Sequence, residues 1–248
     1  MHELPFAAIA RDMDQIASRA VEKTQKHGFW GMAIRARGLA TFLICAVAIA
    51  LSFLLDGWVA DQFAKPIRSG QVRAVLTNLR IWGEGATLLI ISIGIALAQP
   101  RQLRGIVTVL AATLVCASIV EGVKPHFGRM RPSEARVNPA EGNWQFRSGR
   151  NSSFPSGHTA TAFAFGRGLS LLVPSLKPLC LVAATGTAVS RMHEQRHYFS
   201  DCMVGALFGW FASGWVWMLI NRVEQSLARS VLWPWHRSLT REGNASLS

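Results

Sequence analysis

The chain has 248 residues, of which half are apolar and only 16% are charged, whereas soluble domains carry about a quarter charged residues. Lysine and arginine outnumber aspartate and glutamate by 26 to 14, which gives a formal net charge of +12 and indicates an anionic partner. Because the apolar residues form long blocks with the charges between them, the composition favours a membrane protein over a nucleic-acid-binding domain.

The first 37 residues mix charged with apolar side chains, for example Arg11 and Arg19 with Ile9 and Ile16. This mixture predicts an amphipathic helix over 1–37 that lies on a membrane surface. The segment is too charged and too long for the basic region of a signal peptide.

Six charge-poor stretches follow. The first, 38–55, contains no charged residue and is long enough to be a transmembrane helix. Several others fall short of the roughly 20 residues that a span needs, so they must include a few flanking residues. We therefore predict an all-α polytopic bundle of about six transmembrane helices over 38–221, followed by a cytoplasmic tail over 222–248. The remaining five stretches are 85–100, 105–120, 157–173, 176–190 and 202–221.

Six spans would place both termini on the same side of the membrane. That side carries 13 lysines and arginines and the other side carries 12, of which nine remain when the three cations assigned below to a substrate are set aside. The positive-inside rule then favours cytoplasmic termini. The sequence accordingly predicts a multi-pass inner-membrane protein whose loops after the third and fifth spans face the periplasm.

The four cysteines lie in or beside the apolar blocks, without the CxxC spacing of a metal or redox site. We expect them to be small packing residues, and we expect neither a disulfide scaffold nor a zinc ribbon. They are Cys45, Cys116, Cys180 and Cys202.

Three unusual segments lie at the ends of predicted helices on one side of the membrane. They are 124–132, 153–158 and 190–201. Because helix ends on one membrane face can meet in space, we expect the three segments to converge although they are far apart in the sequence.

The residues of these segments suit a phosphate ester. Lys124, Arg131 and Arg191 are fixed cations, and the arginine forks match phosphate oxygens. A helix that opens on Ser156 and Gly157 directs unpaired backbone N–H groups and its positive dipole end at an anion, and the Ser156 hydroxyl can add a donor.

Two histidines supply groups for acid–base or nucleophilic chemistry near neutral pH. They are His158 and His197. Asp201 follows His197 by one helical turn, so its carboxylate could hold the ring N–H and fix the tautomer.

The pattern Lys-x6-Arg-Pro, Pro-Ser-Gly-His and Ser-Arg-x5-His-x3-Asp resembles that of the type 2 phosphatidic acid phosphatase (PAP2) superfamily, in its integral-membrane lipid phosphatase branch. Here it reads Lys124 to Pro132, Pro155 to His158 and Ser190 to Asp201, without departure at any motif position. The motif blocks cover 124–201, and the six-span layout extends the resemblance over about 38–221. Soluble vanadium haloperoxidases share these residues, but the predicted spans argue against that branch.

The resemblance implies a metal-independent phosphatase without a cofactor. In it, His197 attacks phosphorus to form a phosphohistidine, Asp201 orients His197, and His158 protonates the leaving oxygen and later activates water. The phosphoryl oxygens would be held by Lys124, Arg131, Ser156, Gly157 and Arg191.

The partner implied by the family is a lipid phosphate within the membrane. Family members act on phosphatidic acid, phosphatidylglycerophosphate, polyprenyl diphosphates or lipid A, and the sequence does not choose among them. Transfer of the phosphoryl group to another lipid would use the same residues. The oligomeric state is also left open.

Two other classes of function fit parts of the sequence. His193, Glu194 and His197 form the H-E-x-x-H of zinc proteases, with Asp201 as a possible third ligand. That interpretation leaves the cations and the Pro-Ser-Gly-His block without a role. A transporter would instead use ionisable residues within the spans, for which Glu84, Glu121 and Arg167 are the candidates.

Overall fold

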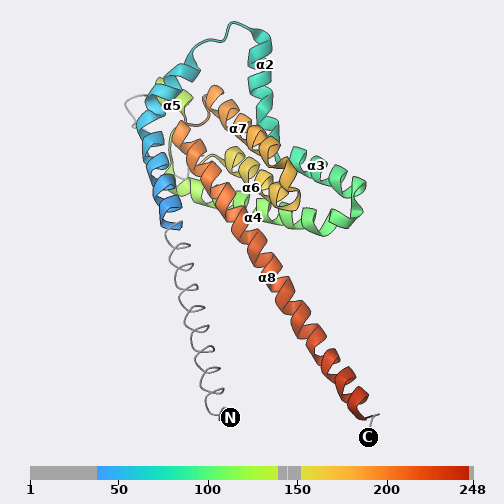
Figure 1. Cartoon of the computed structure of the whole chain (residues 1–248). Coiled ribbons are helices and arrows are strands. Elements are labelled where there is room, and N and C mark those ends of the chain that lie inside the picture. The colour runs from blue at the N-terminus through green and yellow to red at the C-terminus, as the bar shows by residue number, and fades with distance from the viewer. Residues whose placement is uncertain (1–37, 139–143, 145–151, 246–248) are drawn as a thin grey trace, which may run out of the picture. The chain divides into compact units, whose positions relative to one another are not determined.

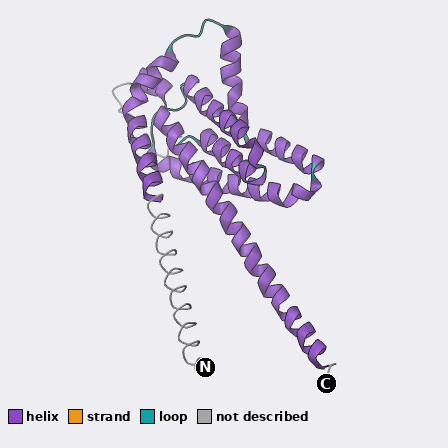
Figure 2. Ribbon diagram, in the orientation of Figure 1, coloured by secondary structure: helices purple, strands orange, loops and turns teal. Residues whose placement is uncertain are grey.

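The structure is a computed structural model that describes residues 38–138, 144 and 152–245, with side chains as far as residue 227. The chain divides into two units, Met1–Ala50 and Leu51–Ser248. Figure 2 shows that the described part is built of helices joined by loops, with no strand; its one β-type pairing is an isolated bridge between Arg129 and Trp144. The predicted all-α class is confirmed, whereas the helix predicted over 1–37 lies outside the described residues.

The helices follow one another along the chain with short connections. The first covers Gly38–Ala64. It is followed by α2 (Gly70–Asn78), α3 (Gly85–Ala98), α4 (Leu103–Phe127), α5 (Pro132–Val137), α6 (Gly157–Leu172), α7 (Lys177–His193) and α8 (Phe199–Ala245), as Figure 1 shows. Short 3-10 turns lie between some of these helices, at η1 (Leu79–Gly83), η2 (Pro100–Gln102) and η4 (Pro174–Leu176).

Each of the six predicted stretches lies mostly on a helix of the structure. In the described part, three segments are long and apolar enough to cross a membrane: Gly38–Ala64, Pro100–Phe127 and Phe199–Leu227. The pair Gly70–Gly83 and Gly85–Ala98, bent by 67°, would make a fourth span. The remaining two stretches form α6 and α7, which have 16 and 17 residues. The membrane helix bundle is confirmed, and the count of six stays a prediction.

Local sequence accounts for where α4 and α5 end and begin. Gly128 terminates α4 in the left-handed region at φ 55°, a conformation that glycine adopts without a steric penalty. Pro132 opens α5, where its missing N–H is tolerated because the first helical turn has no partner for it. These two breaks turn the chain sharply and leave the segment between them, 128–131, outside the helices at the end of α4, where Arg129 and Met130 are buried.

Helix α6 is the centre of the helical packing. It contacts α8 most extensively and then α4 and α7, which surround it in Figure 1. Phe165 of α6 is fully buried and meets Trp82 edge to face, with 5.7 Å between ring centroids. A core cluster of Leu88, Ile106, Val109, Phe165, Leu169 and Cys180 joins α6 to α3, α4 and α7. Burial on every side fixes the orientation of α6.

The contact between α6 and α8 depends on small residues one helical turn apart. A Cβ on Gly205 would lie 2.6 Å from the Ser156 carbonyl oxygen, and a Cβ on Gly209 would overlap the carbonyl of Ala160. One turn later, the Ser213 hydroxyl donates to the Ala164 carbonyl at 2.8 Å. Such small-residue spacing lets two helix backbones approach closely in a membrane. It holds the first turns of α6 and α8 against each other.

The last helix does not stop at the predicted domain boundary. Helix α8 continues beyond residue 221 to Ala245, so the expected division between 38–221 and the tail 222–248 does not coincide with a helix end. Arg104 at the start of α4 forms an ion pair with Glu224 on this continuation. All four cysteines are free, as expected, and Cys116, Cys180 and Cys202 are buried.

Candidate active site

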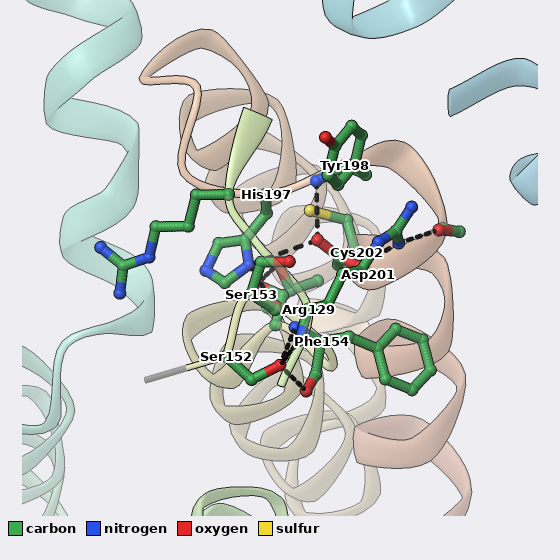
Figure 3. A network of polar contacts seen from close by, with 12 residues as sticks. Arg129, Ser152, Ser153, Phe154, His197, Tyr198, Asp201 and Cys202 are labelled. Carbon is green, nitrogen blue, oxygen red and sulfur yellow. Dashed lines mark hydrogen bonds and ion pairs between the residues drawn. The ribbon is translucent and has the colours of Figure 1, made fainter. Parts of the chain in front are cut away.

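The three predicted segments lie together, joined by backbone hydrogen bonds. The Ser153 N–H donates to the Arg129 carbonyl at 2.8 Å, which links the first segment to the second. The Ser156 N–H donates to the Asp201 carbonyl at 3.0 Å, which links the second segment to the third. Figure 3 shows the resulting cluster around His197. The expected convergence of the three segments is therefore observed.

The start of α6 is open to an anion. Ser156 is the N-terminal cap residue, but its buried hydroxyl pairs with the Thr159 hydroxyl at 2.9 Å and makes no capping bond to the backbone. The first N–H groups of a helix have no acceptor within the helix, so they remain available to a ligand. The Ser156 hydroxyl, expected to be a ligand donor, thus already has a protein partner.

Gly157 brings a lysine up to this helix start. A Cβ at position 157 would lie 3.0 Å from Lys124 Nζ and 2.6 Å from Glu121 Oε1, so a larger residue would displace both groups. The Lys124 ammonium is in turn paired with Glu121 at 2.5 Å. The glycine is required because two charged side chains from the end of α4 reach the helix N-terminus at this point.

The two predicted arginines retain unused hydrogen-bond donors. The Nε atoms of Arg131 and Arg191 are buried and have no hydrogen-bond partner in the protein. Arg191 also donates from Nη1 to Glu194 at 2.6 Å, which neutralises part of its charge. A buried N–H without a partner is costly, and an anion bound between these arginines would satisfy both.

The ring of His197 is oriented by the backbone. Its Nδ1 lies 2.7 Å from the Ser153 carbonyl oxygen, and the side chain is only 5% exposed. Because a carbonyl oxygen can only accept, Nδ1 carries the proton and Nε2 keeps its lone pair. Burial lowers the pKa of His197, while Asp201 acts in the opposite direction. Near neutral pH the ring is therefore uncharged and Nε2 can act as a nucleophile.

Asp201 is fully buried, but it does not hold the ring N–H of His197 as expected from the spacing. Its Oδ2 lies 3.8 Å from His197 Nδ1, beyond hydrogen-bond distance. Instead Oδ2 accepts the Tyr198 N–H at 2.7 Å, and Oδ1 accepts from Arg129 at 2.5 Å. The reason is local: α8 begins at Phe199, so His197 precedes the helix and is not one turn from Asp201 within it.

His158 stands in the first turn of α6 and is partly buried. Arg191, His197 and Lys124 lie close enough to act electrostatically on its ring. Both histidines are therefore in one cationic site, with His158 on α6 and His197 in the loop between α7 and α8.

Two functional candidates were missed by the sequence analysis, Arg129 and Asp56. Arg129 is buried and binds Asp201 and Asp56 together. Its position two residues before Arg131 was visible, but nothing local distinguished it from a surface cation. Asp56 directly follows an apolar stretch, where an aspartate is typical of the end of a span.

The zinc-protease interpretation of His193 to His197 is not supported by the geometry. Helix α7 ends at His193, and Gln195 has a φ of 55°, so the two histidines do not share the face of one helix. Glu194, the base in that scheme, pairs with Arg191. Among the described residues, no group of three His, Cys, Asp or Glu side chains is arranged to hold a metal ion.

The ionisable residues suggested for transport have other surroundings. Glu84 pairs with Arg80 at 3.3 Å, and Glu121 pairs with Lys124. The Arg167 guanidinium lies over the Trp210 ring at 4.9 Å from its centroid. The two glutamates thus belong to the cationic side of the molecule and do not form a pathway with Arg167.

Comparison with known proteins gives one family. Residues 105–225 match the PAP2 superfamily. A protein of Rhizobium etli named lipid A 1-phosphatase is 29% identical over 199 residues, which cover 71% of this chain and 82% of that protein. A Porphyromonas gingivalis protein of the same name is 37% identical over 95 residues, which cover 37% of this chain and 18% of that protein.

A solved structure is also similar. It is the crystal structure of a transmembrane PAP2-type phosphatidylglycerolphosphate phosphatase from Bacillus subtilis, which is 20% identical with a TM-score of 0.49. The similarity covers 75% of this chain and 94% of that one.

Proposed function

We propose that this membrane protein is a lipid phosphatase and that it works through a phosphohistidine on Nε2 of His197; the match of residues 105–225 to the PAP2 superfamily supports this proposal. The observation that carries this mechanism is the 2.7 Å contact of His197 Nδ1 with the Ser153 carbonyl. It leaves Nε2 unprotonated in the site where the predicted phosphate-binding residues gather.

In the first step, Nε2 of His197 attacks phosphorus while the bond from phosphorus to the ester oxygen breaks. The negative charge of the bound phosphate favours the protonated form of His158, which donates its proton to the leaving oxygen, so the lipid departs as an alcohol. The charge that spreads over the phosphoryl oxygens is met by the α6 N–H groups and by Lys124, Arg131 and Arg191.

In the second step, water replaces the lipid. His158, now neutral, accepts a proton from the water molecule, whose oxygen attacks phosphorus. The phosphorus–Nε2 bond breaks, inorganic phosphate leaves and His197 is regenerated with its proton still on Nδ1. The Asp201 carboxylate stabilises the positive charge that develops on the His197 ring.

The substrate we propose is a phosphomonoester or diphosphate carried by a lipid. A site formed by the ends of apolar helices suits an amphiphile whose tail stays in the bilayer while its phosphate reaches the cations. The relatives named lipid A 1-phosphatase make lipid A the first candidate to test. We further propose an inner-membrane location with the site on the periplasmic face, since that orientation satisfies the positive-inside rule.

The test measures release of inorganic phosphate by the purified protein in detergent. The panel contains lipid A, phosphatidic acid, phosphatidylglycerophosphate and a polyprenyl diphosphate, each with and without EDTA. We expect hydrolysis of at least one, unaffected by EDTA and inhibited by vanadate. A labelled phosphoprotein peptide at His197, trapped by acid-free quenching, would support the intermediate. Loss of all activity in EDTA would contradict the mechanism, and label found on an added acceptor lipid would assign phosphotransfer.

A further inference from the structure

Arg129 sits between two buried carboxylates from distant parts of the chain. Its Nη1 donates to Asp201 Oδ1 at 2.5 Å, and its Nη2 donates to Asp56 Oδ2 at 2.6 Å. All three side chains are at most 8% exposed. One planar guanidinium therefore bridges the first helix and α8.

Asp56 also caps the start of α8. Its Oδ1 accepts the Ser200 backbone N–H at 2.8 Å, and its Oδ2 accepts the Ser200 hydroxyl at 2.6 Å. That hydroxyl in turn accepts from Arg129 Nη1 at 2.7 Å. A carboxylate at a helix N-terminus is favourable because it meets free N–H groups and the positive end of the dipole. Ser200, the residue next to Asp201, is thus held by both Asp56 and Arg129.

Aromatic rings enclose the arginine. The guanidinium carbon lies 4.1 Å from the centroid of Tyr198, 4.7 Å from that of Trp144 and 5.5 Å from that of Phe53. Such rings attract a cation and also exclude water. Charge interactions within this enclosure are therefore weakly screened, so a change of charge on Arg129 or Asp56 is felt at neighbouring groups.

We propose that Asp56 and Arg129 are positioning residues, which hold the Asp201 carboxylate in place and set the charge that it presents to His197. The proposal rests on the function proposed above, since it takes His197 as the nucleophile. Arg129 partly neutralises Asp201, and Asp56 partly neutralises Arg129. The three form one alternating chain of charges that ends 3.8 Å from the His197 ring.

Other charged groups also face His197 and would stay constant in the test. Asp201 of α8 and Arg191 of α7 act on it directly, and His158 of α6 is electrostatically coupled to it. The fixed neighbour from the second segment is uncharged: it is the Ser153 carbonyl. Changes at positions 56 and 129 therefore alter only the contribution of Asp201 to the protonation of His197, while the other groups around the ring stay the same.

The two single variants should move the protonation of His197 in opposite directions. Arg129→Gln leaves Asp201 more negative, which favours the imidazolium, so the acid limb of kcat/KM should shift to higher pH. Asp56→Asn leaves Arg129 more positive, so the same limb should shift to lower pH. Each shift should be about 0.5 to 1 pH unit, below the roughly 1 to 3 units of a charge in direct contact, because both residues act through Asp201. If Asp56 and Arg129 had a purely structural role, neither variant would shift the acid limb.

The control variants separate charge from shape. Arg129→Lys keeps the charge but cannot bridge both carboxylates, so kcat should fall at least about tenfold while the limb moves little. The double variant Asp56→Asn with Arg129→Gln removes one charge of each sign, so its limb should return to the wild-type position. Asp61→Asn is the negative control. Asp61 lies on the same helix as Asp56 but in an exposed ion pair with Arg136, so this variant should change neither kcat nor the acid limb.

A second readout needs no turnover. The rate at which diethylpyrocarbonate modifies His197, followed by mass spectrometry across pH, reports the same protonation. Opposite shifts in both readouts support the proposal. Shifts of one sign, or none, overturn it, and where Arg129→Gln does not fold, Asp56→Asn and the double variant decide. Opposite shifts in chemical modification, with no phosphatase activity in the wild type, would refute the proposed function alone.

Discussion

At the scale of single residues, the hydrogen bond of His197 Nδ1 to a backbone carbonyl is the contact on which the proposed chemistry depends. The usual partner of a reactive histidine is a carboxylate, which stabilises the imidazolium as well as the tautomer. Here the tautomer is fixed by the Ser153 carbonyl, and Asp201 acts through charge from 3.8 Å. The two roles of an orienting carboxylate are thus divided between two groups.

This division of roles predicts that substitutions at His197 and Asp201 reduce activity by unequal amounts. His197→Gln removes the nucleophile and should abolish phosphate release, while the folded protein is recovered from detergent in normal yield. Asp201→Asn keeps an oriented imidazole and should retain activity, reduced by about 10² to 10³-fold, less than the roughly 10⁴-fold loss when a carboxylate alone sets the tautomer. Initial rates on the preferred lipid measure both, and equal losses would contradict the division.

Burial of His197 predicts a particular pH dependence. Burial lowers the pKa of this group, so the ring stays neutral to a pH below the ordinary histidine value of 6.5. The acid limb of kcat/KM should therefore lie below that ordinary value, because the nucleophile is lost only as the folded-state pKa of His197 is passed. The measurement is kcat/KM against pH, corrected for the substrate's own ionisation by phosphorus NMR in the same vesicles. An acid limb of kcat/KM above pH 6.5 would contradict this prediction.

The sequence predicted the residues of each motif, because motif spacing is a local property that one chain displays directly. It could not predict the partners of those residues. Asp56 and Arg129 meet across 73 positions, and neither lies in a pattern that distinguishes it from a span end or a surface cation. The Asp201 geometry was predicted wrongly because the i, i+4 rule holds only within a helix, and α8 starts after His197.

At the scale of elements, the close approach of α6 and α8 determines whether the site is assembled. The Ser156 carbonyl faces Gly205, and Ala160 faces Gly209, so the helix start that would bind phosphate rests on these two glycines. Apolar patterning predicted both helices, because their charge-poor lengths are visible in the sequence. Their pairing was not predicted, since a small residue in one helix does not identify the helix that packs against it.

Gly209→Leu should destabilise this contact strongly. Even a Cβ at position 209 overlaps the Ala160 carbonyl, so the helices must separate, and a change of this kind costs about 1 to 3 kcal/mol or more. We expect a lower midpoint of thermal unfolding in detergent, with loss of phosphatase activity.

Gly94→Leu on α3 is the matched control for this variant. No atom lies within 4 Å of a Cβ built at position 94, so the larger side chain has room. Its unfolding midpoint should equal or exceed that of the wild type. A fall equal to that of Gly209→Leu would show that leucine is harmful in any of these helices, whatever its contacts.

At the scale of the whole molecule, the proposed orientation in the membrane can be tested at the two ends of α7. Lys177 opens this helix on the side predicted to hold the termini, whereas Ser133 on α5 donates its N–H to Gln195, just past the other end. In a Cys45→Ala background, a membrane-impermeant maleimide should label Ser133→Cys in intact cells and Lys177→Cys only after permeabilisation. The reverse pattern would place the site in the cytoplasm.

The lengths of α6 and α7 have a consequence for the surrounding lipid. With 16 and 17 residues they span about 24 to 26 Å at 1.5 Å per residue, less than the hydrocarbon thickness of about 30 Å. Helix α7 exposes Leu179 and Val182, so in the predicted six-span arrangement its short outer face would meet lipid. Such a mismatch would favour a bilayer thinned beside α7, which would bring the headgroup region of a leaflet closer to the site. Vesicles of short-chain phosphatidylcholine should therefore support faster turnover than those of long-chain lipid, and the bilayer itself becomes a determinant of access.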